Sequence, residues 1–147
     1  MELQHLVTDV PLIAAIAVFA LLPAICEEVA FRGAMLGGLL PRRQSGERTD
    51  YEGIIEAIVI SAMFFGVVHG ILQQSINAAL LGCLLGFLAV RTSSLYPCMA
   101  YHFTHNAGAI AEISHLPSLL SFSLGVVAVF CMRKQSKPNT DICLPRP

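Results

Sequence analysis

The apolar run from Val10 to Leu40 contains two adjacent carboxylates and a guanidinium, in the stretch CEEVAFR. Ionisable side chains inside a membrane-spanning segment are energetically costly, and they usually face a partner or a functional cavity. The chain is 55% apolar and 13% charged, against roughly 25% charged residues in an average soluble domain. The sequence therefore predicts an all-α, polytopic membrane helix bundle in which Glu27, Glu28 and Arg32 have partners.

Breaks in the apolar pattern divide the chain into helices. Pro23 is expected to kink the first helix one turn before the glutamates. Several apolar segments are shorter than the roughly 20 residues that a membrane span needs, so tilted or re-entrant helices are expected. The predicted core runs from 11 to 132, and a polar tail follows at 133–147. Its five helices are expected at about 11–40, 52–68, 75–90, 96–113 and 118–132.

Glycine pairs recur at the GxxxG spacing, which lets helix backbones approach closely. Chance in a glycine-rich apolar chain explains each pair equally well. The pairs are Gly33/Gly37, Gly66/Gly70 and Gly82/Gly86.

Positive charge is distributed unevenly between the predicted helix ends. Apart from Arg32, all lysines and arginines fall in the 41–53 loop, the 91–95 turn and the C-terminal tail, whereas the opposite helix ends carry none. The positive-inside rule predicts a multi-pass protein of a bacterial-type plasma membrane, with the 41–53 loop and the C-terminus cytoplasmic. No basic stripe indicates nucleic-acid binding. The scattered cysteines predict neither a disulfide framework nor a thiolate–metal site.

Spacing on the first helix distinguishes the two glutamates. Glu28 and Arg32 are four residues apart, so they lie on one helix face, where a salt bridge can form. Glu27 lies about 100° away around the helix and is free to face another group. A buried ion pair that only holds helices together is an equally simple interpretation of the Glu28–Arg32 spacing.

Two further polar pairs lie on other apolar helices. The second predicted helix ends on Phe65-x-x-x-His69, and the fourth carries His102-x-x-x-Asn106. Each pair alone is weak, because a single histidine is more often a core or interface residue. Together with the glutamates, they supply a carboxylate, two imidazoles and a carboxamide. Such a set can form a general base with an oxyanion hole, or a metal site.

The ordered motifs EExxxR, FxxxH and HxxxN resemble those of the CPBP family of intramembrane proteases, which includes type II CAAX prenyl endopeptidases and bacteriocin-processing or self-immunity proteins. The stretch from Gly86 to Pro97 is also similar to the family's approach to the third motif. The resemblance covers about 11–130. It implies a glutamate-type membrane endopeptidase that hydrolyses a peptide bond near the membrane.

The resemblance also implies a role for each motif residue. Glu27 would be the general base, and His69 would help to hold and activate the water. His102 and Asn106 would stabilise the oxyanion of the tetrahedral intermediate. Supporting roles would fall to Glu28 and Arg32. Phe31 and Phe65 are interpreted as packing residues around this cluster.

Metal-independent chemistry is preferred over zinc, so no cofactor is predicted. The chain has no HExxH or other compact zinc signature, and the candidate ligands come from three separate helices. If zinc were required, its ligands would be Glu27, His69 and His102.

The sequence is compatible with three functions. The first is an active endopeptidase whose partners are the lipid bilayer and a peptide or membrane-associated protein substrate. The others are a non-catalytic membrane immunity or partner-binding protein of the same fold, and a transporter fragment whose polar cluster lines an ion path. The complete motif set favours the enzyme. Relatives usually carry further helices before the EExxxR helix, so missing N-terminal helices or a partner subunit are expected.

Overall fold

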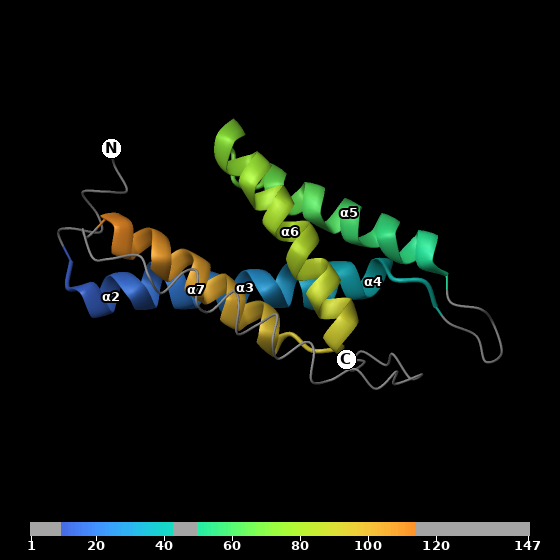
Figure 1. Cartoon of the computed structure of the whole chain (residues 1–147), viewed down its shortest axis with the longest axis horizontal. Helices are drawn as coiled ribbons and strands as arrows, with labels where there is room; N and C mark the ends of the chain where they lie inside the picture. The colour runs from blue at the N-terminus through green and yellow to red at the C-terminus, as the bar shows by residue number, and fades with distance from the viewer. Residues whose placement is uncertain (1–9, 43–49, 114–147) are drawn as a thin grey trace. The chain divides into compact units, whose positions relative to one another are not determined.

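The computed structural model describes residues 10–42 and 50–113. Over these ranges the chain forms four helices and no strands (Figure 1), which confirms the predicted all-α fold class. The described residues fall into two compact units, 10–28 with 96–113 and 29–42 with 50–95. The predicted fifth helix, 118–132, and the polar tail, 133–147, lie outside the described residues.

The first unit pairs the N-terminal half of the long first helix with the last described helix. The first helix consists here of α2 (Leu12–Ile16), the π-helical η1 (Ala17–Leu21) and α3 (Leu22–Glu28). Its partner is α7 (Tyr96–Ile113), which runs antiparallel beside it (Figure 1). Aliphatic and aromatic side chains fill the space between them: Ala15, Ala20 and Ile110 are buried, and Ile16, Phe19, Phe103 and Ala107 pack around them.

Pro23 lies two residues after the π-helical η1. Proline has no backbone N–H, and its ring crowds the carbonyl four residues earlier, so the regular α-helical pattern is hard to maintain there. Single π-helical turns inside α-helices are frequent near functional sites. A second π-helical segment, η2 (Val29–Leu36), follows directly after the glutamates.

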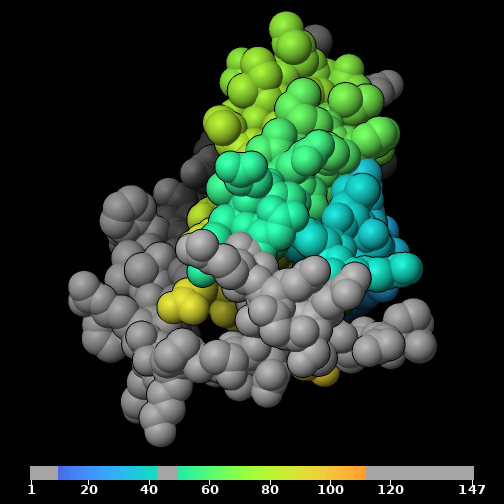
Figure 2. Space-filling view, turned by 90° about the vertical axis from the view of Figure 1, so that its right-hand side faces the viewer, coloured from blue at the N-terminus to red at the C-terminus, as the bar shows by residue number. Residues whose placement is uncertain are grey.

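The second unit combines η2 and α4 (Gly37–Leu39) with α5 (Tyr51–Val67) and α6 (Leu72–Thr92). In Figure 2, α5 in green packs against the cyan end of the first helix. The Asp50 side chain caps α5 by accepting a hydrogen bond from the Gly53 N–H at 2.9 Å. A tight turn at 68–71 leads directly into α6.

Glycines let α5 and α6 approach closely. A Cβ at Gly82 would lie 3.0 Å from both Cα and Cβ of Ala62, and one at Gly86 would lie 3.0 Å from Ile58. A Cβ at Gly66 would lie 2.7 Å from the Ser75 carbonyl oxygen. The GxxxG pair on α6 therefore has the packing role that its spacing predicts.

Two helices are long and apolar enough to cross a bilayer. They are Leu12–Leu39, which is 28 residues long, and Leu72–Thr92, which is 21 residues long. At 1.5 Å per residue, each exceeds the roughly 30 Å thickness of a hydrocarbon core.

Candidate active site

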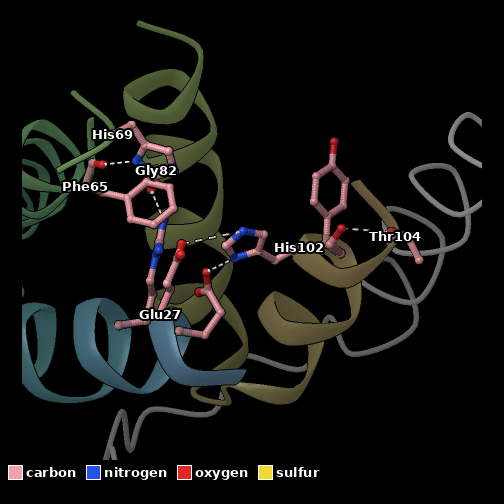
Figure 3. Close-up of polar contacts among 9 residues, drawn as sticks. Glu27, Phe65, His69, Gly82, His102 and Thr104 are labelled. Carbon is pink, nitrogen blue, oxygen red and sulfur yellow. Dashed lines mark hydrogen bonds and ion pairs between the residues drawn. The ribbon is translucent and has the colours of Figure 1, made fainter. Parts of the chain in front are cut away.

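A buried imidazole and a buried carboxylate meet in the first unit. His102 on α7 is 3% exposed and Glu28 on α3 is 0% exposed. The Nδ1 atom of His102 lies 2.8 Å from Oε1 of Glu28 (Figure 3). A carboxylate accepts hydrogen bonds, so Nδ1 is the donor in this pair. The contact fixes the orientation of the His102 ring and the position of its Nδ1 proton.

The side chain of Glu27, the neighbouring residue, is partly exposed to solvent. Its side chain is 33% exposed, and its Oε2 atom lies 3.8 Å from Nε2 of His102. This separation is too long for a hydrogen bond. Oε2 is a buried atom with no hydrogen-bond partner among the described residues.

Asn106 lies one turn after His102 on α7 and is partly buried. The spacing of four residues places the carboxamide and the imidazole on the same helix face. The first unit therefore brings two carboxylates and an imidazole together, with a carboxamide one turn away.

In the second unit, Arg32 lies buried between α5 and α6. Its Nη2 atom donates a hydrogen bond to the Gly82 carbonyl oxygen at 3.3 Å, and the residue is 1% exposed. Its guanidinium carbon lies 4.4 Å from the centroid of the Phe65 ring, a cation–π geometry. Ser61, also buried, donates to the Phe31 carbonyl oxygen at 3.1 Å and ties α5 to η2.

His69 lies at the end of α5 and is half-buried. Its Nδ1 atom bonds to the Phe65 carbonyl oxygen at 2.7 Å (Figure 3). A carbonyl oxygen only accepts, so Nδ1 carries the proton, and Nε2 of the neutral ring presents a lone pair. His69 is therefore suited to accept a proton or to hold a water.

The structure brings some of the predicted residues together and adds contacts that were not predicted. Glu27, Glu28 and His102 form one cluster, whereas His69 and Arg32 belong to the second unit, so the predicted pairing of Glu27 with His69 stays a prediction. Helical spacing assigned Glu28 to Arg32 and missed its contact with His102, 74 residues away. Residue spacing within one helix carries no information about a partner on another helix.

No group of three metal-ligating side chains that could hold an ion occurs among residues 10–42 and 50–113. The choice between metal-free and zinc-dependent chemistry stays a prediction.

Two of the described helices are apolar and long enough to span a bilayer, which is typical of a helical membrane protein. The buried carboxylate–imidazole pair on α3 and α7 is a candidate hydrolytic site. Residues 9–108 match the family described as type II CAAX prenyl endopeptidase Rce1-like. The chain belongs to this family, and the matched range contains all three motifs, so the predicted CPBP relationship is confirmed. Comparisons with curated proteins and with solved structures gave no match.

Proposed function

We propose that this chain is an intramembrane endopeptidase in which Glu27 activates water for attack on a peptide bond. Membership of the CAAX endopeptidase family supports this class of reaction. The observation that carries the assignment of the base is the contrast between the two glutamates. Glu28 is fully buried and bonded to His102 through Oε1, whereas the Glu27 side chain is 33% exposed and is the glutamate that water and substrate can reach.

In the proposed reaction, Glu27 takes a proton from water as the oxygen attacks the scissile carbonyl carbon. A carboxylate placed within hydrogen-bonding reach of a water can act as its general base. His69 would hold the water through its Nε2 lone pair, since its Nδ1 proton is donated to Phe65. The protonated Glu27 then gives its proton to the leaving amine as the C–N bond breaks.

The oxyanion of the tetrahedral intermediate requires donors. His102, protonated and paired with Glu28, would donate from Nε2, and Asn106 would donate from its amide group. Removal of one such donor typically lowers kcat by about 10²–10³. Glu28 would then act by stabilising the His102 imidazolium, and Arg32 by holding η2 against α6.

The proposed substrate is a prenylated CAAX protein, as the family's description indicates, cut near the membrane surface. The proposed topology is multi-pass, with the 41–53 loop and the C-terminus cytoplasmic. Further N-terminal helices or a partner subunit would complete the substrate groove.

The test is cleavage of labelled peptides by the purified full chain in detergent. A farnesylated CAAX peptide should be cut faster than its unprenylated counterpart, and Glu27→Ala should abolish cleavage. Glu56→Ala, which removes an exposed glutamate on α5, serves as the matched control and should leave the rate unchanged. Cleavage unaffected by both Glu27→Ala and His69→Ala would exclude the mechanism. Equal cleavage of both peptides would exclude the proposed substrate class.

A further inference from the structure

Phe65 is the residue on which the aromatic and cationic side chains of the second unit converge. It is 1% exposed. Its ring centroid lies 5.0 Å from that of Phe31 and 4.9 Å from that of His69, both in edge-to-face arrangements. The Arg32 guanidinium carbon lies 4.4 Å from the same centroid. An aliphatic side chain could fill this volume, but it would offer neither a negative face to the guanidinium nor a polarised edge to the other rings.

The backbone of Phe65 holds the same imidazole. Helices leave their last carbonyls without an intrahelical donor. At the end of α5 the His69 N–H bonds to the Gly66 carbonyl oxygen at 3.1 Å, and His69 Nδ1 bonds to the Phe65 carbonyl oxygen at 2.7 Å. The FxxxH spacing thus lets a side-chain donor bond to a carbonyl near the helix end.

A single hydrogen bond does not fix the plane of an imidazole. It fixes the Nδ1-protonated tautomer only while the ring stays against the carbonyl. An imidazole that is free to turn about its side-chain bonds loses this hydrogen bond part of the time, and its two tautomers then mix. The edge-to-face contact with the Phe65 ring, at an interplanar angle of 67°, supplies the second constraint. Arg32 and Phe31 in turn restrain the Phe65 ring.

We propose that Phe65 is a positioning residue for His69: its carbonyl and its ring together hold the imidazole in the orientation in which Nε2 accepts a hydrogen bond from the attacking water. This inference rests on the proposed role of His69 in hydrolysis. It assigns the first residue of the FxxxH motif a part in the reaction rather than in packing alone.

The test compares Phe65→Leu with Phe64→Leu, the same substitution at the adjacent residue of α5, which is 55% exposed. Peptide cleavage gives kcat and KM. In parallel, ¹⁵N spectra of the histidine-labelled full chain in detergent, recorded at alkaline pH, report the tautomer of His69. The His69 signals are assigned by their loss in His69→Gln.

Wild type should show a protonated Nδ1 and an unprotonated Nε2 at His69. Phe65→Leu should bring these two nitrogen signals toward an average. It should also lower kcat by about 10–100-fold and leave KM within about twofold of wild type, because a small misplacement of a catalytic group changes the rate by this much. Phe64→Leu should change neither. A wild-type His69 spectrum in Phe65→Leu overturns the proposal, whatever happens to kcat. A changed spectrum with wild-type kcat also overturns it.

Two further measurements keep the outcome decisive. If Phe65→Leu does not fold, trifluorinated phenylalanine at 65, which has nearly the same shape but a weaker negative face, replaces it. It should disturb the His69 signals, and unchanged signals overturn the proposal. If wild type cleaves neither peptide, the proposed function fails, and the His69 spectrum alone then decides whether Phe65 positions the ring.

Discussion

The Nδ1 atom of His102 lies 2.8 Å from the Oε1 atom of Glu28, so an imidazole on α7 and a carboxylate on α3 form a buried pair. A buried carboxylate bonded to Nδ1 holds an imidazole in one tautomer and one orientation, as in hydrolases that use an acid–histidine pair. The adjacent Glu27 makes no such bond through its Oε2 atom. Two consecutive residues of the same type therefore have different surroundings, and substitutions should separate them.

Substitutions at Glu28 should reduce both activity and stability. Glu28→Gln retains an oxygen that can accept from His102 Nδ1 but removes the charge, so kcat should fall by about 10²-fold. Glu28→Ala leaves the buried imidazole without its acceptor and should lower the free energy of unfolding by about 3–5 kcal/mol. Peptide cleavage and thermal denaturation in detergent measure the two effects. Wild-type kcat in Glu28→Gln would show that His102 does not depend on this carboxylate.

Glu27→Gln should abolish cleavage without destabilising the protein. A buried carboxylate oxygen without a hydrogen-bond partner opposes folding, so removal of its charge should leave stability unchanged or raise it by up to about 1 kcal/mol. Residues retained for chemistry rather than stability commonly behave in this way. The contrast with Glu28→Gln in the same denaturation experiment is the control. Equal destabilisation by both substitutions would mean that Glu27 also has a structural partner.

Chelation should leave the activity unchanged. In the proposed mechanism Glu27 removes the proton from water directly, so no Lewis acid is needed. The measurement is the cleavage rate before and after dialysis against a chelator, with a zinc-dependent peptidase treated in parallel. Loss of activity that added zinc restores would instead favour zinc bound by Glu27, His69 and His102.

Much of the fold could be predicted from the sequence because apolar segments and their breaks are local features. The expected 96–113 helix matches α7, since Pro97 is tolerated only in the first turn of a helix. α6 begins at Leu72, three residues before the expected start at 75, because the polar residues Gln73 and Gln74 belong to its first turn. Polar residues at an exposed helix start are compatible with helix, and composition alone does not distinguish the two cases.

The site could be predicted only in part. Spacing along one helix identified the chemically capable residues, because positions four apart share a face. It could not identify partners across helices, since helix rotation depends on packing that no single segment encodes. The Glu28–His102 bond and the hydrogen bond from Arg32 to the Gly82 carbonyl are both contacts of this kind.

Gly70, which follows His69, should resist substitution because of its backbone conformation. Its φ is +71°, and a Cβ there would meet no atom within 4 Å. Gly70→Ala should therefore cost about 1–2 kcal/mol through left-handed strain alone. Gly38→Ala is the matched control, because Gly38 has equally open surroundings within helix α4 and no positive φ. It should be neutral or stabilising, since alanine is the better helix former. Equal effects at both positions in thermal denaturation would contradict the strain argument.

Substitution of Gly82 should destabilise the protein because α5 and α6 are crowded at this position. A Cβ there would lie 3.0 Å from Cα and Cβ of Ala62, so α6 must move away from α5 or distort. The Gly82 carbonyl, which accepts from Arg32, would move with it. Gly82→Ala should therefore lower the free energy of unfolding by about 1–3 kcal/mol.

The double variant tests whether contact with Ala62 is the cause of this effect. Ala62→Gly removes one of the two crowded atoms, so Ala62→Gly/Gly82→Ala should be more stable than the sum of the single effects predicts, with a coupling of at least about 0.5 kcal/mol. Denaturation of the wild type and the three variants under one condition measures this coupling. Strict additivity would mean that Gly82 is required for another reason, such as the position of its carbonyl relative to Arg32.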